Sequence, residues 1–319
     1  MTNETNYAAI DLGSNSCRLL ICNQKGERLL EENYATRLAQ GMGKERRISA
    51  EAFGRAKEAF AEIRRHLDEW QVREENMRAI TTAACRMACN SEEFIKQIKQ
   101  LSGIRLEIID GRSEAELNLQ GAAWHAKGKG EYVVVWDLGG GSTEVTLATN
   151  GNKPSILRTI SIPYGARNGA EDFALADYDK SKANKLEKVV DGYLDEFLLE
   201  GKLPTGNSGK VCFVATSSTP LRLVSMLEGK QEYNRREADG HIIKRAKLRE
   251  LLDEIYRKKT DELAKEPCVG ESRAPIFAAA CVIFARIAER LGAEEIIASL
   301  KSAKDAIIVN LMERDKNNG

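Results

Sequence analysis

The chain has 319 residues, of which 42% are hydrophobic and 30% charged, a balance typical of a folded protein rather than a disordered one. Its 48 basic and 48 acidic side chains give a formal net charge of +0, which excludes a globally basic nucleic-acid binder and a globally acidic tail protein. At this length we expect roughly two domains. No apolar run approaches the roughly 18 residues of a membrane span, and residues 1–7 lack the apolar stretch of a signal peptide.

The seven cysteines are scattered and none forms a CxxC pair, while the three histidines have no metal-ligand spacing. An odd number of dispersed thiols is typical of reduced cysteines. We therefore expect a cytoplasmic protein with neither a disulfide framework nor a zinc site.

Strands and helices alternate along the first half of the chain. The pattern of apolar residues predicts strands at 7–10, 17–22, 78–82 and 106–109, and helices at 50–70, 91–102 and from 113 to about 126. The last helix is predicted to begin at Ser113, because Ser113 and Glu116 form a capping-box pattern.

The second half repeats this organisation. It predicts strands at 132–136, 145–148, 211–215 and 295–299, and helices at 220–227, 244–259, 276–291 and 303–312. Asp-Leu-Gly opens a short turn at Asp11 and again at Asp137, 126 residues later (137 − 11). A repeat near half the chain length indicates duplicated domains that face each other. We place one domain at 1–124 with a returning segment 302–319, and the other at 125–301.

Each Asp-Leu-Gly turn joins two predicted strands and is rich in Gly, Ser or Asn. Glycines let the backbone approach a ligand, and successive N–H groups then form a concave anion site to which hydroxyls add donors. A carboxylate beside such a turn can hold Mg²⁺, which in turn binds phosphate oxygens. Asp137 and Glu144 flank the second turn and can converge on one Mg²⁺, with Asp11 as the counterpart in the first turn. The alternative is an Asp that only caps its own turn.

Two such turns in duplicated halves predict two phosphate-binding loops that face one cleft, and they carry a family resemblance. Residues 9–16 (Ala-Ile-Asp-Leu-Gly-Ser-Asn-Ser) and 137–144 (Asp-Leu-Gly-Gly-Gly-Ser-Thr-Glu) resemble the phosphate loops of the exopolyphosphatase/guanosine pentaphosphate phosphohydrolase family. Residues 81–90 and 108–117 resemble two further segments of that family. The resemblance covers nearly the whole chain. It implies an α/β fold of two ribonuclease-H-like, actin-like domains flanking an interdomain cleft, in the family's short two-domain form.

The resemblance also implies a function. It predicts a hydrolase that releases terminal phosphate from inorganic polyphosphate, or from guanosine pentaphosphate, with Mg²⁺ as cofactor. Glu114 aligns with the family's catalytic glutamate, which activates the attacking water; without the resemblance, a Glu at a helix start is only a favourable partner of the helix dipole. Arg86 matches a family arginine near the cleft and is a candidate phosphoryl clamp, with a solvated surface arginine as the alternative.

Asp137 and Glu144 complete the expected catalytic set with Glu114 and Arg86, and they are the expected metal ligands together with Asp11. Phosphate contacts are assigned to residues of the two loops: Ser14, Asn15, Ser16, Gly139, Gly140, Gly141, Ser142 and Thr143.

Three departures from the family pattern concern the substrate. Glu116 stands where the family has Arg, Ser217-Ser218 replaces a Gly-Gly pair, and residues 303–306 (Ala-Lys-Asp-Ala) lack a family glycine. Two alternatives therefore stay open: a sensor that binds polyphosphate or an alarmone without cleaving it, and a kinase of the same superfamily. We expect neither a nucleic-acid polymer nor a membrane as partner, and a homodimer is retained as a hypothesis.

One segment of the second half is locally basic. Residues 230–259 hold ten basic and six acidic side chains, a net charge of +4 (10 − 6). A solvated helix face is the ordinary interpretation of such a segment. The alternative is a rim that guides a polyanion, which would place Lys244, Arg245 and Lys247 on the path of the substrate.

Overall fold

A computed structural model describes residues 5–42, 45–151, 154–199 and 211–318. The chain divides into two compact units: unit 1 comprises 1–117 and 303–319, and unit 2 comprises 118–302. The first division falls inside one helix, α4 (Gly111–Ala126), whereas the sequence placed the domain limits at 124 and 302. Within the described ranges, every helix is too short or too polar to cross a membrane.

Unit 1 is built on a five-stranded sheet with the order β3-β2-β1-β4-β5. Its strands are β1 (Asn6–Leu12), β2 (Cys17–Asn23), β3 (Arg28–Tyr34), β4 (Met77–Thr81) and β5 (Leu106–Ile108). The first three strands form antiparallel hairpins. The last two run parallel to β1, so the carboxyl ends of β1 and β4 lie at the same edge of the sheet.

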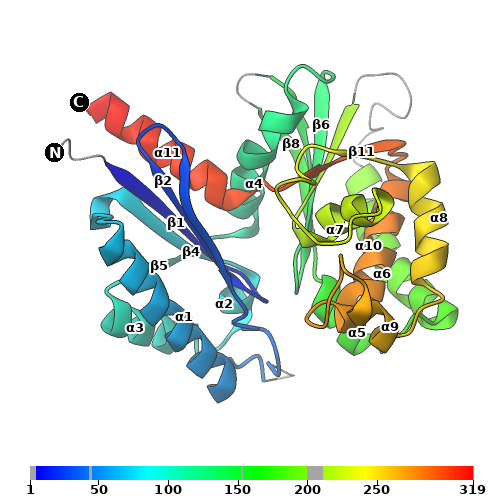
Figure 1. Ribbon diagram of the computed structural model, residues 1–319, viewed down its shortest axis with the longest axis horizontal. Coiled ribbons are helices and arrows are strands. Elements are labelled where there is room, and N and C mark those ends of the chain that lie inside the picture. The colour runs from blue at the N-terminus through cyan, green and yellow to red at the C-terminus, as the bar shows by residue number, and fades with distance from the viewer. Residues whose placement is uncertain (1–4, 43–44, 152–153, 200–210, 319) are drawn as a thin grey trace. The chain divides into compact units, whose positions relative to one another are not determined.

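Helices cover both faces of this sheet. One face packs against α1 (Ala50–Glu69), α2 (Ala83–Met87) and α3 (Ser91–Ser102) through a core that includes Ile10, Phe60 and Phe94. A 3₁₀ turn, η1 (Glu74–Asn76), leads into β4. The other face packs against α11 (Ala303–Asn318) (Figure 1). Ile307 and Leu311 of this helix are buried in one cluster with residues of the strands. The C-terminal helix is therefore part of the core of unit 1.

Unit 2 is built on a six-stranded sheet with the order β10-β11-β9-β6-β7-β8. Its strands are β6 (Tyr132–Leu138), β7 (Thr143–Thr149), β8 (Ile156–Ile162), β9 (Val211–Thr216), β10 (Ile242–Lys244) and β11 (Glu295–Ser299). Again the first three strands form antiparallel hairpins, and β9 and β11 run parallel to β6.

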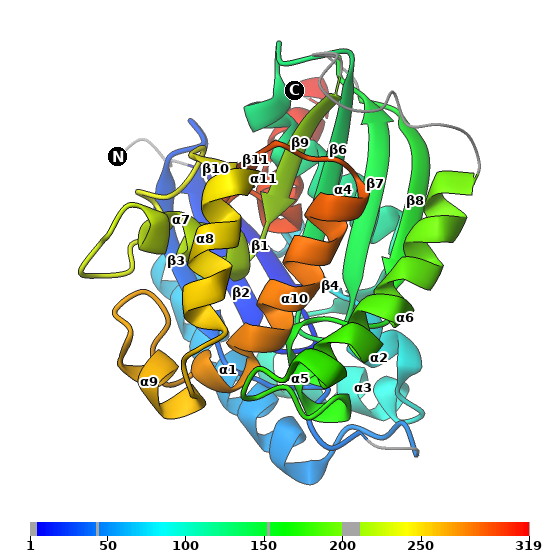
Figure 2. The ribbon, with the colours of Figure 1, turned by 90° about the vertical axis from the view of Figure 1, so that its right-hand side faces the viewer.

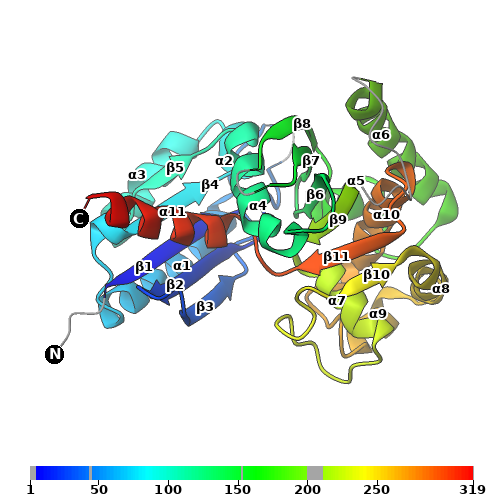
Figure 3. The ribbon, with the colours of Figure 1, turned by 90° about the horizontal axis from the view of Figure 1, so that it is seen from above.

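The larger core of unit 2 lies on the face of its sheet that α10 covers (Figure 2). There Trp136 packs against Phe284 of α10. The helices of this side are α5 (Ala166–Asp172), α6 (Lys180–Leu199), α7 (Ser218–Leu227), α8 (Arg245–Ile255), α9 (Thr260–Lys265) and α10 (Ala274–Arg290). The opposite face is covered by the second half of α4 (Figure 3). Leu119, Ala122 and Ala126 of this helix are buried in one cluster with residues of the strands.

The two units repeat one plan. The order β3-β2-β1-β4-β5 in unit 1 corresponds to β8-β7-β6-β9-β11 in unit 2. Each first hairpin closes with the same bond, from the amide of Gly13 to the Ser16 carbonyl and from the amide of Gly139 to the Ser142 carbonyl, both at 3.0 Å. The duplication predicted from the two Asp-Leu-Gly turns is therefore present in the fold.

The start of α4 differs from the prediction. The helix begins at Gly111, because the side chain of Asp110 accepts a hydrogen bond from the amide of Ser113 at 2.7 Å and caps the first turn. That bond is also the main reason why the pKa of Asp110 is lowered. The expected capping box is wrong, since Glu116 lies 3.2 Å from Arg112 and forms an exposed ion pair instead.

Candidate active site

The second Asp-Leu-Gly turn is held by the start of α5. Three groups there donate to its carbonyls: the amide of Ala166 to Gly139 (2.9 Å), the amide of Arg167 to Gly140 (2.8 Å) and Nδ2 of Asn168 to Gly141 (2.9 Å). The approach is so close that a Cβ on Gly165 would lie 2.5 Å from the Gly139 carbonyl oxygen. Within the described ranges, no hydrogen bond uses the amides of Gly140 or Gly141 as donors. With the carbonyls tethered and these amides available, the loop is suited to an anion.

The first turn is tethered in the same way by other residues. The Ser14 carbonyl accepts from the amide of Ala39, and the Asn15 carbonyl accepts from the amide of Arg37, both at 2.9 Å. Ser14 and Ser16 are each 8% exposed. The predicted serines of the first loop are therefore buried in unit 1, on a backbone whose carbonyl groups are held by hydrogen bonds.

Two of the predicted carboxylates stand side by side in unit 2. Asp137 at the end of β6 is the direct register partner of Glu144 on β7. On its other side Asp137 is in register with Thr216 of β9. Residues in register point to the same face of a sheet, so these three side chains form a polar row. Glu144 is 4% exposed and accepts a hydrogen bond from the Ser161 hydroxyl at 2.9 Å.

Among the described residues, one of the two oxygens of the Asp137 carboxylate accepts a hydrogen bond. Its Oδ2 accepts from Nδ2 of Asn118 at 3.0 Å. Its Oδ1 is buried and has no hydrogen-bond partner among the described residues, and the same holds for the hydroxyl of Thr216. Orphaned oxygens beside a second carboxylate fit Mg²⁺, which takes one or two carboxylates and keeps several waters. A cluster of three or more His, Cys, Asp or Glu residues does not occur in the described parts of the chain.

Asp11 lies in a different environment from its counterpart. Its register partner on β2 is Arg18, and Nη1 of Arg18 lies 3.6 Å from Oδ2 of Asp11. A cation therefore occupies the position that a carboxylate occupies in the second hairpin.

Glu114 and Arg86 are brought together within unit 1. Nη1 of Arg86 donates to Oε2 of Glu114 at 2.9 Å and to the Ile109 carbonyl at 2.8 Å. Glu114 is 8% exposed. The sequence placed both residues in the site but did not foresee the ion pair, which gives the guanidinium a second role: it fixes the direction of the carboxylate.

A third loop, at Ser217 between β9 and α7, carries backbone strain. Ser217, where the family has glycine, adopts φ 87 and ψ −171, a region that is essentially reserved for glycine. Its hydroxyl donates to the Leu138 carbonyl at 2.8 Å and ties this loop to the end of β6. Thr143, assigned to phosphate contact, is fully buried and donates its hydroxyl to the Tyr164 carbonyl at 2.7 Å.

Several basic side chains of residues 230–259 form ion pairs. Arg245 pairs with Glu294, and Lys247 lies 2.8 Å from Glu250. Lys258 pairs with Glu266, and Lys259 lies 3.4 Å from Asp177. These contacts favour the solvated helix face over a path for a polyanion.

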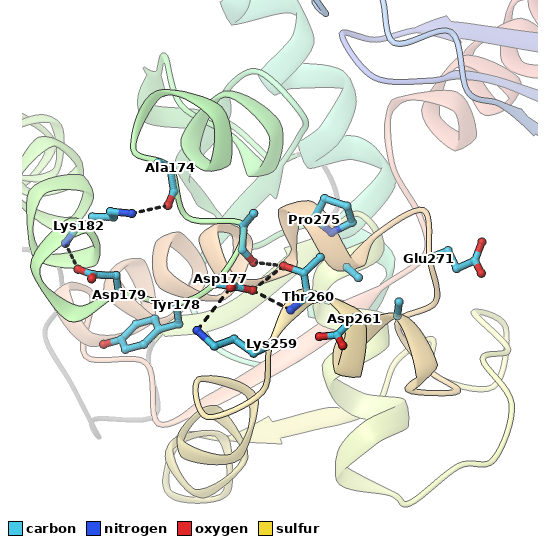
Figure 4. Close-up of a pocket in the computed structure, with 13 residues that line it drawn as sticks. Ala174, Asp177, Tyr178, Asp179, Lys182, Lys259, Thr260, Asp261, Glu271 and Pro275 are labelled. Carbon is cyan, nitrogen blue, oxygen red and sulfur yellow. Dashed lines mark hydrogen bonds and ion pairs between the residues drawn. The ribbon is translucent and has the colours of Figure 1, made fainter.

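A cavity of about 820 Å³ in unit 2 contains none of the candidate site residues (Figure 4). Its wall carries four acidic side chains, Asp177, Asp179, Asp261 and Glu271, against Lys182 and Lys259. Asp177 is already engaged, because it accepts from the amide and the hydroxyl of Thr260, both at 2.8 Å. With more negative than positive groups, this cavity is unsuited to a polyphosphate chain.

The sequence analysis missed two polar residues that lie beside Asp137. Thr216 was placed in the segment that follows the strand predicted at 211–215, and Asn118 was not singled out. A signal for Asn118 exists: it lies four residues after Glu114, and residues so spaced share one face of a helix.

Comparisons with known proteins show which family the chain resembles. A model of the Ppx/GppA phosphatase family matches residues 21–315. The chain is 27% identical over 323 residues to the guanosine-5'-triphosphate,3'-diphosphate pyrophosphatase of Aeromonas hydrophila, with 98% of this chain and 60% of that protein aligned. The chain thus spans about 60% of the length of the curated relatives from two Aeromonas species that it matches.

Solved structures share the fold. An exopolyphosphatase-like protein superposes with a TM-score of 0.87 at 24% identity, over 99% of this chain and 100% of the other. An exopolyphosphatase from Cytophaga hutchinsonii superposes with a TM-score of 0.81 at 23% identity, over 97% of this chain and 98% of the other. The α/β architecture predicted from the sequence is therefore confirmed. Because the family model extends over most of its length, the chain belongs to the Ppx/GppA phosphatase family.

Proposed function

We propose that the protein hydrolyses the terminal phosphoanhydride bond of inorganic polyphosphate, with guanosine pentaphosphate as the second candidate substrate. The observation that carries the proposal is the pair Asp137 and Glu144, which lie in register beside a loop with available amides. The name of the Aeromonas relative and that of the Cytophaga protein support this substrate class.

Each part of the proposed site has one task. The amides of Gly140 and Gly141 and the hydroxyls of Ser14 and Ser16 bind phosphate oxygens. Asp137 and Glu144 are the residues that would hold Mg²⁺, which when bound neutralises phosphate charge. Asp11 instead orients Arg18, whose guanidinium faces the phosphates of the first loop.

In the proposed reaction, a water oxygen attacks the terminal phosphorus and the bridging P–O bond breaks. Glu114 accepts the proton of the attacking water, and Arg86 holds the Glu114 carboxylate in place. The shortened chain leaves with the bridging oxygen. Positioning and charge neutralisation supply most of the catalysis in phosphoryl transfer, which suits a site made of loops and carboxylates.

The proposal includes the cellular compartment and the partners of the protein. All seven cysteines are free thiols, which supports a reducing compartment such as the cytoplasm. The proposal involves neither a nucleic-acid polymer nor a membrane, and a homodimer stays a prediction.

The main competing function is a sensor that binds the same ligands without cleavage. The strained Ser217 at the third loop is the observation that favours it. Phosphate release from long-chain polyphosphate and from guanosine pentaphosphate, each with and without Mg²⁺, separates the two. Magnesium-dependent release from either substrate supports the hydrolase. Binding of either substrate without release supports the sensor.

A further inference from the structure

We infer that Asn118 is a positioning residue that aims the Asp137 carboxylate, an inference that rests on the proposed magnesium site. Asn118 lies on α4 and is 4% exposed. Its Nδ2 donates to Oδ2 of Asp137 at 3.0 Å. An Asn at a buried helical position lowers helix propensity and requires hydrogen-bond partners, so a contact with a predicted site residue calls for an explanation beyond packing.

The explanation lies in the chemistry of the amide group. An Asn amide nitrogen is a donor, so it engages one carboxylate oxygen and leaves the other free to act. In Asp137 the other oxygen, Oδ1, is the buried one that lacks a hydrogen-bond partner among the described residues. The backbone of Asp137 is already set by its register with Glu144 and Thr216. With the backbone and one oxygen held, Oδ1 has a fixed direction.

The helix that carries Asn118 is itself held in place. Leu119, Ala122 and Ala126 of α4 are buried against the sheet face on which Asp137 lies. At Gly121 the helix approaches the Ser302 backbone so closely that a Cβ would lie 2.3 Å from the Ser302 carbonyl oxygen. The amide is therefore presented from a rigid element, as residues that orient metal ligands require.

Two substitutions of similar size separate positioning from packing. Asn118→Leu removes the donor, and Asn118→Asp replaces it with an acceptor. The matched control is Asn150→Leu, which also removes a side-chain amide donor. Nδ2 of Asn150 donates to the carbonyls of Ala126 (2.7 Å), the last residue of α4, and Gly130 (3.0 Å). The probe is Mn²⁺ added to the metal-free protein without substrate, with free Mn²⁺ measured by electron paramagnetic resonance. Thermal stability and the Mg²⁺ dependence of phosphate release are measured in parallel.

We expect Asn118→Leu to weaken Mn²⁺ binding about 10–100-fold, the range typical for residues that orient a metal ligand. The Mg²⁺ concentration at half-maximal rate should rise by a similar factor. Asn118→Asp adds a third carboxylate, so its metal-free form should melt lower and Mn²⁺ should raise its Tm more than that of the wild type. Asn150→Leu should lower the Tm and leave Mn²⁺ affinity unchanged.

The inference is overturned if Asn118→Leu loses thermal stability but keeps wild-type Mn²⁺ affinity, as the control does. Failure of the proposed metal site gives a different result. In that case Asp137→Asn binds Mn²⁺ as well as the wild type, or the wild type binds none, and the inference falls with it.

Discussion

The two Asp-Leu-Gly hairpins share a backbone and differ in charge. In unit 1 the carboxylate of Asp11 faces the guanidinium of Arg18 at 3.6 Å. In unit 2 Asp137 faces Glu144, and among the described residues the donor to its carboxylate is the neutral amide of Asn118. The same fold thus holds a balanced pair on one hairpin and two acids on the other. A balanced pair can present a cation directly to phosphate, whereas two acids need a metal ion to do so.

The largest effect should come from a residue outside both hairpins. Glu114→Gln keeps the size of the side chain and removes the base, so we expect phosphate release to fall by about 10²–10⁴-fold while substrate binding survives. The control is Glu116→Gln on the same helix, whose carboxylate pairs with the exposed Arg112. Activity within a few-fold of wild type in Glu114→Gln would remove this residue from the mechanism.

Substitutions in the two hairpins should change the Mg²⁺ dependence of the rate differently. Asp137→Asn and Glu144→Gln should raise the Mg²⁺ concentration at half-maximal rate by about 10–100-fold, because each removes a charged ligand. Asp11→Asn should leave this concentration unchanged. The three Mg²⁺ titrations, run beside melting curves, make the comparison. An equal shift in all three variants would mean that both hairpins hold metal and that their charge difference has no functional meaning.

A substitution in the first hairpin should change the affinity for the substrate. Arg18→Leu removes the cation, and loss of a charge-assisted hydrogen bond costs about 1.5–3 kcal/mol, so KM for polyphosphate should rise about tenfold or more. The Mg²⁺ dependence should stay as in the wild type. Steady-state kinetics at saturating Mg²⁺ test this, and a variant with normal KM would show that Arg18 does no more than neutralise Asp11.

Strain also distinguishes the two halves. At the ends of the equivalent strands β4 and β9, Thr82 has φ −126 whereas Ser217 has φ 87. Ser217→Gly and Ser217→Ala both lose the hydroxyl, so the difference between them isolates the backbone. The glycine variant should be more stable by about 1–3 kcal/mol. Denaturant unfolding of both variants measures this, and equal stabilities would contradict the presence of strain.

The smallest effect concerns the cap of α4. The pKa of Asp110 is lowered in the folded protein, so its contribution to stability is complete above the ordinary pKa of about 3.9 and is lost as the pH falls towards the folded value. Asp110→Asn retains an acceptor without the charge. We expect the Tm of the wild type to fall more steeply than that of Asp110→Asn between neutral pH and pH 3, as followed by thermal melts.

The sequence predicted the hairpins well because their signals are local. Residues 7–10 and 17–22 bracket a turn within one short stretch, and both strands form there. The strands β3 and β8 were missed because β3 is largely half-exposed and β8 alternates between half-exposed and exposed residues. The helix predicted at 244–259 ends earlier, as α8 (Arg245–Ile255), because a helix pattern with many charges does not reveal where the helix ends.

The contacts that organise the site could not be predicted, because they join residues far apart in the chain. Arg86 and Glu114 are 28 residues apart, and Asn118 and Asp137 are 19 apart. Spacing along one helix or strand carries no information on such pairs. The cap of α4 was predicted wrongly for a local reason: Ser113 and Asp110 both suit a cap, and the side chain of Asp110 forms the bond.

The return of the last helix to unit 1 has a consequence for biosynthesis. Ile307 and Leu311 of α11 are buried against β1 and β2, so the core of unit 1 is incomplete until residues 303–318 have been made. All of unit 2 is synthesised in the interval, and it holds every strand of its own sheet within 118–302. During translation the second-made unit can therefore finish folding first, while the first-made sheet keeps one apolar face uncovered and exposed to chaperones or aggregation.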